Sequence, residues 1–437
     1  MGQDERGVAD RTLVTTGLAR VEGEGSMYIR VAGGAVEQVR LDIYEPPRFF
    51  EAFLRGRAFT EPPDITARIC GICPVAYQTS ACWAIEAACG VELTAELAAL
   101  RRLLYCGEWI SSHALHVYML HAPDFLGYPG AVEMARDHKE VVERGLALRR
   151  TANAIMAAVG GRSVHPVNVR VGGFYRAPDP AELRPLAGEL RSALDLALET
   201  VRWTASFDFP EFSIGHELLA LTSPGRYPIE GGSVITSGGL AFTAADFEQH
   251  VIEEQVPHST ALHARLAGRP GSYLTGPLAR YSLNSQWLPP AAADAARAAG
   301  LGRQCRNPFQ SIVVRAVEIV CAVEEAIRLI DEYVPPREPF VPAAAREGRG
   351  HGLSEAPRGV LYHRYDLAAD GTVTGARIVP PTSQNQAAIT ADLRDFVADR
   401  LDFADDALTH ACEQAIRNYD PCISCATHFL DLRMDRR

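Results

Sequence analysis

The chain has 437 residues, of which 47% are hydrophobic and 22% charged, a balance typical of a large globular enzyme. Its formal net charge of −11 argues against a nucleic-acid partner, which requires a basic face. No apolar run is long enough to span a bilayer, and the polar start MGQDERGVADRT lacks the apolar core of a signal peptide, so we expect no direct membrane insertion and a cytoplasmic location.

Residues 13–45 alternate apolar and polar positions, with glycine turns at 23–25 and 33–34, and predict a small antiparallel sheet. Sequences rich in alanine, leucine, glutamate and arginine follow this region and predict helices. The predicted helices cover residues 76–88, 94–121, 132–159, 181–203 and 244–266.

The clearest helical pattern covers residues 310–334. From Val313 to Ile330, valine and isoleucine recur at spacings of three and four and form one apolar stripe, which we expect to lie in the core. The proline pair at 335–336 ends this helix. Alternation and glycine turns predict hairpins over 226–242 and 358–380, periodicity predicts helices over 386–402 and 404–418, and proline and glycine predict loops at 286–291 and 335–352.

These elements predict a mainly α fold with small β-sheets, an α+β class. We expect one integrated domain over residues 1–437, because no internal repeat or long linker interrupts it. Within it we distinguish a small β region (1–60), a helical core (61–225) and a region of hairpins and helices (226–437).

Four of the ten cysteines form two Cys-x-x-Cys pairs. Cys70 and Cys73 lie in RICGICP, and Cys422 and Cys425 lie in DPCISCATH. Each pair can direct two soft thiolates at one metal ion. The other cysteines are expected to be buried small hydrophobic residues in a reducing compartment; they are Cys82, Cys89, Cys106, Cys305, Cys321 and Cys412.

Three kinds of site fit these two pairs. A structural zinc site is one, although zinc-ribbon pairs usually lie about 15–20 residues apart, whereas these pairs are separated by about 350 residues. A redox Cys-x-x-Cys would explain only one pair. A catalytic metal site would use both pairs and needs no short spacing.

The surroundings of both pairs resemble the signature motifs of the nickel–iron hydrogenase large subunit. The first is R-x-C-G-x-C-P and the second is D-P-C-x-x-C-x-x-H near the C-terminus. Further blocks resemble the family in the same order along the chain; they are RVEG at 20–23, FE at 50–51 with LRGR at 54–57, HALH at 113–116 with PDF at 123–125, GGR at 160–162 with HP at 165–166, EAPRG at 355–359 and VPPTS at 379–383. The resemblance implies the family's large-subunit fold and the reversible heterolytic cleavage of dihydrogen to protons and electrons.

The resemblance also implies a nickel–iron centre whose iron carries carbon monoxide and cyanide. Cys70 and Cys422 would bind nickel terminally, and Cys73 and Cys425 would bridge nickel and iron.

Other residues take roles around this centre by the same resemblance. Arg358 would lie over the open site, in the Pro357-Arg358 turn, with Thr382 or Ser383 donating to a cyanide. The resemblance makes Asp124 and Asp420 the acids that orient Arg358, and Glu22 the proton relay beside the terminal cysteine of the second pair. A magnesium ion, or Fe²⁺, would be bound outside the centre; its expected ligands are Glu51, the backbone near Ile378, and His428.

Two features depart from, or extend, the family pattern. Tyr77 stands where the family usually has a histidine that hydrogen-bonds a bridging sulfur. Residues 429–437 follow His428, and we expect them to be a short C-terminal propeptide or a retained tail.

The chain has no further cysteine motif for an iron–sulfur relay, so electrons must leave through partners. The resemblance is strongest to the cytosolic NAD(P)-linked bidirectional group, with a deazaflavin-linked relative as the alternative. It implies an iron–sulfur small subunit, flavin and iron–sulfur diaphorase subunits, and a maturation chaperone and endopeptidase. The competing functions are a zinc-stabilised interaction protein and a non-catalytic electron-transfer scaffold related to complex I.

Overall fold

The computed structural model describes residues 10–45 and 49–427. The N-terminal residues form the predicted antiparallel sheet, in the order β1 (Arg11–Thr15), β2 (Gly25–Ala32) and β3 (Ala35–Ile43). Alternate residues of β2, including Met27 and Ile29, are fully buried, as a half-buried sheet requires. The sheet packs against α13 (Pro381–Ala398).

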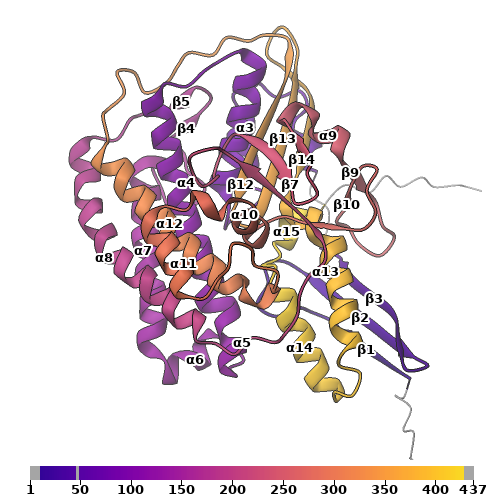
Figure 1. The fold of residues 1–437 in the computed structure, drawn as a ribbon. Helices are drawn as coiled ribbons and strands as arrows, with labels where there is room; N and C mark the ends of the chain where they lie inside the picture. The colour runs from indigo at the N-terminus through magenta and orange to yellow at the C-terminus, as the bar shows by residue number, and fades with distance from the viewer. Residues whose placement is uncertain (1–9, 46–48, 428–437) are drawn as a thin grey trace, which may run out of the picture.

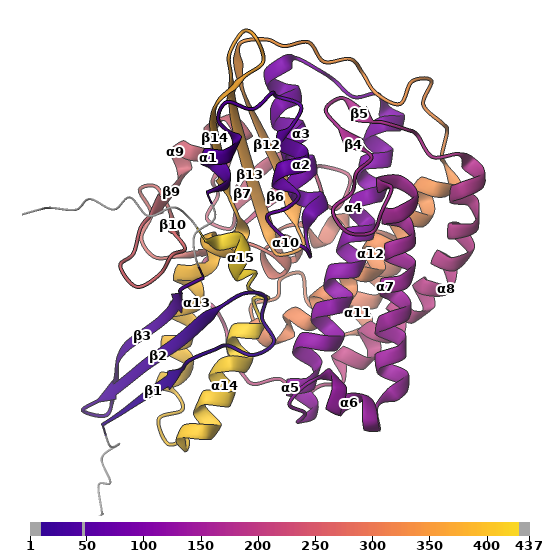
Figure 2. The same ribbon diagram turned by 180° about the vertical axis from the view of Figure 1, so that it is seen from behind.

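Long helices form the largest layer. The helices α4 (Ala95–Leu115), α7 (Lys139–Gly160), α8 (Pro180–Ala205) and α12 (Ser311–Asp331) lie side by side (Figures 1 and 2). The predicted apolar stripe of α12 is buried in this layer. The π-helix His116–His121 continues α4 into α5 (Ala122–Leu126).

The shorter helices connect these layers. They are α1 (Phe50–Leu54), α2 (Pro62–Thr66), α6 (Ala131–Asp137), α9 (Phe247–His250), α10 (Pro277–Asn284), α11 (Pro290–Ala298), α14 (Asp405–Arg417) and α15 (Ile423–Ala426), with 3₁₀ turns at Ala244–Asp246, Ser285–Trp287 and Pro308–Gln310.

A three-stranded meander carries α3 (Pro74–Cys89) on one face. Its strands are β12 (Gly348–Ala356), β13 (Gly359–Leu367) and β14 (Val373–Val379). Alternate glycines of β12 let the helix lie directly on the strand, since a Cβ at Gly350 would meet Ala84 O at 1.9 Å and one at Gly352 would meet Ser80 O at 2.4 Å. The loop predicted over 335–352 therefore ends earlier than expected, where β12 begins.

The remaining strands are short. They are β4 (Val169–Arg170) with β5 (Gly173–Phe174), the sheet of β11 (Tyr273–Leu274), β6 (Glu217–Thr222), β7 (Ser233–Thr236) and β8 (Ala241–Phe242), and the ribbon of β9 (Val251–Glu254) with β10 (His263–Leu266).

Two of the predicted helices are wrong in extent. The helix predicted over 244–266 stops at His250, and the rest of the segment forms the β9–β10 ribbon. Pro257 disfavours a helical conformation at the preceding residue and has no N–H to donate. The helix predicted over 132–159 is interrupted at His138, whose ψ of 47° is not helical.

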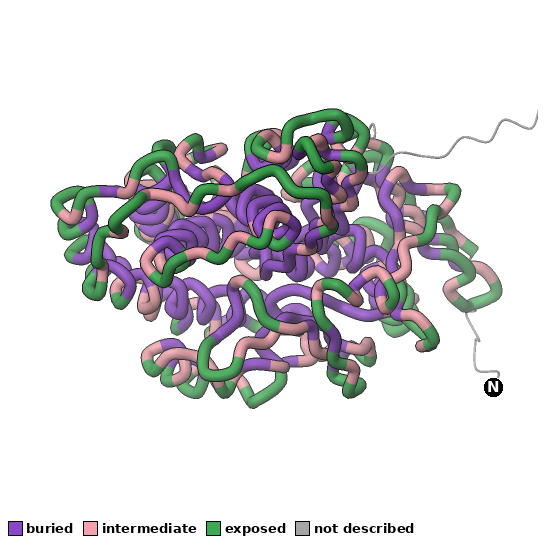
Figure 3. Tube along the Cα trace, turned by 90° about the horizontal axis from the view of Figure 1, so that it is seen from above, coloured by how far each residue is buried: buried purple, intermediate pink, exposed green. Residues whose placement is uncertain are grey.

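One main hydrophobic cluster draws side chains from the N-terminal sheet, the helical layer and the segments around both cysteine pairs. Figure 3 shows the buried segments inside and the exposed loops outside. The predicted fold class, mainly α with small β-sheets, is confirmed, while the division at residues 60 and 225 stays a prediction. In the described part of the chain, no helix has both the length and the apolarity needed to cross a bilayer.

Candidate metal centre

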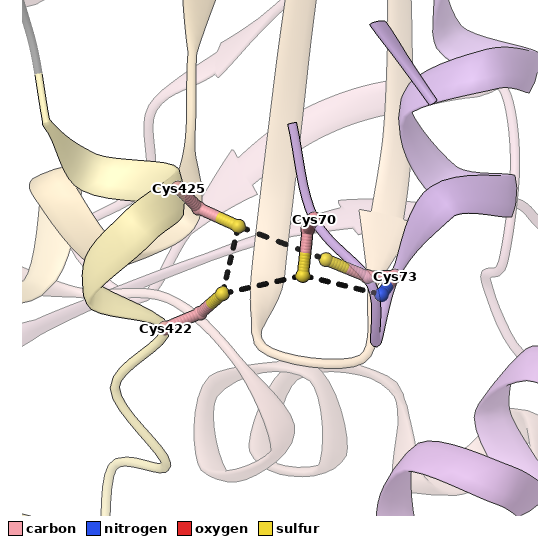
Figure 4. A group of neighbouring side chains, drawn as sticks. All are labelled: Cys70, Cys73, Cys422 and Cys425. Carbon is pink, nitrogen blue, oxygen red and sulfur yellow. Dashed lines mark hydrogen bonds between the residues drawn. The ribbon is translucent and has the colours of Figure 1, made fainter. Parts of the chain in front are cut away.

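The structure brings the two cysteine pairs together (Figure 4). Cys70 and Cys73 lie in the turn that leads into α3, and Cys422 and Cys425 lie at the start of α15 and within it. Cys70 Sγ lies 3.4 Å from Cys422 Sγ, Cys73 Sγ lies 3.9 Å from Cys425 Sγ, and the two sulfurs of the second pair are 2.7 Å apart. All four cysteines are buried and free of disulfide bonds, and their ligand atoms lie within 4.8 Å of one another.

The four thiols cannot all ionise in this buried place without a cation. Hydrogen bonds from the neighbouring thiols, that of Cys422 first, lower the pKa of Cys70 well below its usual value. Burial and the neighbouring sulfurs raise the pKa of Cys422 well above its usual value. A bound metal ion would favour deprotonation of several thiols at once, because thiolates are its ligands. The donor set therefore fits a soft metal centre.

Glu108 fixes the turn of the first pair. It is fully buried on α4, and its carboxylate accepts the peptide N–H groups of Val75 at 2.6 Å and Ala76 at 3.0 Å. These N–H groups belong to the first turn of α3 and have no intrahelical partner, so the carboxylate satisfies them. Burial raises the pKa of Glu108 well above its usual value.

Glu22 fixes the second pair and faces its first sulfur. The Cys422 thiol donates to Glu22 Oε2 at 3.1 Å, and the Ser424 N–H donates to the same oxygen at 3.0 Å. The backbones also meet, because the Ile423 N–H donates to Glu22 O at 2.8 Å. The carboxylate is therefore held within proton-transfer distance of Cys422.

Arg358 lies near the sulfurs, in the turn between β12 and β13, and is 2% exposed. Its Nε donates to Asp420 O at 2.8 Å, and its Nη2 donates to Asp420 Oδ1 at 3.0 Å. Burial disfavours the charged guanidinium, but Asp420 and the thiols raise the pKa of Arg358 well above its usual value. A cation is thus fixed beside the cysteines by two hydrogen bonds to Asp420.

Asp124 does not take the predicted role. Its carboxylate accepts from Arg417 Nε at 2.7 Å and Nη2 at 2.8 Å, and it also pairs with Arg20. No hydrogen bond joins it to Arg358 among the described residues. Asp124 instead ties α5 to the end of α14 and to the segment before Glu22, so the prediction that it orients Arg358 is wrong.

Thr382 and Ser383 lie at the start of α13, close to the second pair. Thr382 Oγ1 accepts the Cys422 N–H at 3.1 Å, and Ser383 Oγ donates to Pro380 O at 2.9 Å. The proton of the serine hydroxyl is therefore already used within the protein.

The comparisons with known proteins are consistent with this geometry. The sequence model of the family described as nickel-dependent hydrogenase matches residues 48–143. Sulfhydrogenase 1 subunit alpha of Pyrococcus furiosus is 34% identical over 419 residues, which cover 95% of this chain and 97% of that protein. The chain belongs to the nickel-dependent hydrogenases.

Other relatives match this hydrogenase over nearly its whole length. The beta subunit of the NAD-reducing hydrogenase HoxS of Cupriavidus necator is 28% identical and covers 96% of this chain. The crystal structure of an NAD⁺-reducing [NiFe]-hydrogenase in its dihydrogen-reduced state superposes with a TM-score of 0.87 at 27% identity, over 96% of this chain and 99% of that one. Family membership decides against the zinc-stabilised protein and the non-catalytic scaffold.

A second possible ion site lies next to the centre of this hydrogenase. Glu51 and Ile378 line a cavity of about 660 Å³, and Cys425 and Thr427 lie on its wall. The Ile378 N–H donates to Glu51 Oε1 at 2.8 Å, so two of the three predicted ligand positions are neighbours. The third, His428, lies outside the described residues, as does the proposed propeptide, residues 429–437.

Sequence reasoning missed several residues that hold this hydrogenase's centre in place. Glu108 and Ser112 lie one helical turn apart on α4, and Arg358 Nη1 donates to Ser112 Oγ at 3.5 Å. Arg417 precedes the second pair on α14 and donates to Asp124. Glu108 and Arg417 are charged residues in helical segments, and only their near-complete burial distinguishes them from surface charges.

Tyr77 lies on the first turn of α3, four residues after Cys73, and is 1% exposed. Its hydroxyl has no hydrogen-bond partner among the described residues. Burial, and the nearby charges of Cys425 and Cys73, raise the pKa of Tyr77 well above its usual value. The phenol therefore lies beside the Cys425 sulfur, but no acceptor among the described residues meets the geometry of a full hydrogen bond.

The Tyr77→Phe variant is expected to stabilise the metal-free, full-length chain by about 1–3 kcal/mol, because it removes a buried hydroxyl that lacks a partner. Urea unfolding measures this free energy. Tyr105 is the matched control: it is also fully buried, but its hydroxyl donates to Ser354 Oγ at 2.7 Å, so Tyr105→Phe should destabilise by about 1 kcal/mol. A metal-free Tyr77→Phe chain less stable than the native chain contradicts this expectation.

Proposed function

We propose that this chain is the catalytic subunit of a nickel–iron hydrogenase that splits dihydrogen reversibly and heterolytically into two protons and two electrons. The observation that carries the proposal is the arrangement around four converging buried sulfurs. Glu22 accepts from Cys422, and Asp420 holds Arg358 near the same cluster. A structural metal site needs neither a proton-accepting acid nor a buried cation next to its sulfurs.

Cys70, Cys73, Cys422 and Cys425 would hold the nickel–iron centre. When bound, that centre supplies the acceptor for the two electrons of dihydrogen. The protein residues accept one proton and stabilise the charge that develops. The Cys422 sulfur can hold this proton, and Glu22 Oε2 lies 3.1 Å from that sulfur and can accept the proton from it. Arg358 supplies a fixed positive charge that needs no reorganisation as charge separates.

The carbon monoxide and cyanide ligands of iron belong to this proposal. Arg358 and the Pro357 peptide would contact one cyanide, and Thr382 would donate to the other. Thr382 is favoured over Ser383, because Thr382 Oγ1 is an acceptor from the Cys422 N–H and keeps its proton for another acceptor. Ser383 already donates its proton to Pro380 O.

We further propose a magnesium ion, or Fe²⁺, in the cavity beside the centre. Glu51 offers a carboxylate, and the backbone near Ile378 offers a carbonyl group, which are hard oxygen ligands suited to magnesium. His428 would complete the protein ligands.

Electrons would leave through an iron–sulfur small subunit and pass on to flavin and iron–sulfur subunits that reduce NAD(P). The relative from Cupriavidus necator and the superposed crystal structure are both described as NAD-reducing hydrogenases, which supports this assembly. In the described residues the four cysteines form the only group of three or more metal-binding side chains within reach of one ion. A maturation chaperone and endopeptidase, and a cytoplasmic location, complete the proposal.

The proposal predicts roughly one nickel with at least one iron per chain after anaerobic purification from a host with hydrogenase maturation enzymes. Carbonyl and cyanide bands should appear in the infrared spectrum, and the intact mass should lack residues 429–437 if that tail is a propeptide. Cys425→Ala should lose nickel and all activity, whereas Cys321→Ala, a buried cysteine of α12, should keep both. One zinc without nickel, in a host that matures a control hydrogenase, would refute the proposal.

A further inference from the structure

Arg280 is a fully buried arginine of α10 that uses all five of its N–H donors. Its Nε and Nη2 donate to the two carboxylate oxygens of Glu318, at 2.7 and 2.8 Å. Its Nη1 donates to Glu355 Oε2 at 2.7 Å. The two acids lie on different elements, α12 and β12, so the guanidinium joins three parts of the fold.

The two remaining donors reach the turn that carries Arg358. Nη1 donates to Ala356 O at 3.0 Å, and Nη2 donates to Pro357 O at 3.2 Å. These are the two peptide carbonyls that precede Arg358. The N-terminus of α10 also touches the turn: a Cβ at Gly276, whose φ is +115°, would meet Arg358 O at 2.7 Å.

The guanidinium is itself held in one plane. Its carbon lies 4.2 Å from the ring centroid of Trp109, and the Trp109 Nε1–H donates to Glu355 O at 2.9 Å. Glu318 is fixed as well, since the Tyr227 hydroxyl donates to it at 2.8 Å and His113 Nε2 lies 3.0 Å away. Arg280 therefore cannot rotate without breaking several buried bonds.

We propose that Arg280 is the positioning residue for Arg358. Arg280 fixes the backbone that leads into Arg358 by donating to the carbonyls of Ala356 and Pro357, and Asp420 fixes the guanidinium of Arg358. With both ends held, the guanidinium of Arg358 keeps one direction relative to the four sulfurs. The inference rests on the proposed function, in which Arg358 acts at the metal centre.

Arg280→Lys is the test variant. Lysine keeps the positive charge between Glu318 and Glu355 but has three donors in place of five, and it cannot serve both acids and both turn carbonyls. We expect a crystal structure of the metal-free variant to show a displaced 356–358 turn and a broken bond from Arg358 Nη2 to Asp420. In the loaded enzyme, kcat for dihydrogen should fall about 100-fold, with little change in KM and a shift of the cyanide bands.

Arg101→Lys is the matched control. Arg101 is also buried and bound to both oxygens of one acid, Glu86 at 2.7 and 2.6 Å, but it does not bond the Arg358 turn. The control should lose stability without displacing Arg358 or lowering kcat. If both variants lose kcat equally, or if Arg280→Lys leaves Arg358 on Asp420, the inference is wrong.

If Arg280→Lys does not accumulate as a folded protein, Trp109→Phe keeps a ring under the guanidinium and removes the donor to Glu355 O. It should shift Arg358 and the cyanide bands in the same sense by a smaller amount, and an unchanged Arg358 in this variant also overturns the inference. The crystal structures need no metal, so failure of the proposed function, seen as native enzyme without nickel, is separate from failure of the positioning role.

Discussion

Glu22→Gln is expected to lower dihydrogen oxidation by about 100- to 10,000-fold while the chain keeps its nickel and iron. Glutamine can still accept the N–H of Ser424, so the second cysteine pair keeps its anchor. It cannot take up the proton of the Cys422 thiol, which donates to Glu22 at 3.1 Å in the native chain. In this variant, dihydrogen should therefore still be split at the metal centre, but its proton should leave the site much more slowly.

Two measurements check this expectation: kcat with an artificial electron acceptor, and exchange of deuterium gas with water, which requires the proton to reach solvent. Glu24→Gln is the control, because Glu24 is an exposed acid two residues away and should leave both rates unchanged. A Glu22→Gln enzyme that keeps more than about a tenth of the native exchange rate would show that the proton leaves by another route.

Arg358→Lys is expected to lower kcat by about 100- to 1,000-fold without loss of the metal centre. The planar guanidinium reaches both Asp420 O and Asp420 Oδ1, whereas a lysine ammonium is a compact charge on a flexible chain and cannot keep that direction. The measurements are kcat, nickel content and the cyanide bands of the infrared spectrum.

Arg364→Lys provides the comparison on β13, the strand that follows the Arg358 turn, since Arg364 pairs with Glu248 of α9 and not with the residues around the cysteines. It should leave kcat unchanged. Loss of nickel in Arg358→Lys, rather than loss of rate, would mean that Arg358 acts in assembly and not in the reaction.

The cysteine pairs, Glu22 and the Arg358 turn could be predicted because short motifs carry them. The positions that hold them could not, because a buried charged residue resembles a surface one in sequence. Glu108 and Arg280 are recognised only when their partners are known, and the partners nearest in the sequence lie 32 and 38 residues away, respectively.

The fold errors have a similar origin. Gly348, Gly350 and Gly352 are poor strand formers, so the sequence predicts a loop where the first part of β12 lies. The close approach of α3 explains these glycines, and it can be seen only in the three-dimensional structure. The segment after His250 carries helix-forming residues, yet pairing of β9 with β10 and burial of Val251 and Leu266 override that preference. The Asp124 error arose because the two buried arginines Arg358 and Arg417 each pair with a different buried aspartate, and the order of the motifs does not say which pairs form.

The separation of the two pairs along the chain has a consequence for biosynthesis. Cys422 follows Cys70 by 352 residues, and translation at about 5–20 residues per second therefore delays its arrival by roughly 20–70 s. During that interval the first pair exists without its partners, and the backbone pairing of Glu22 with Cys422 has not formed. In a newly made chain, the thiols of Cys70 and Cys73 are therefore exposed for a time to oxidation, to binding of other metal ions and to disulfide formation with each other.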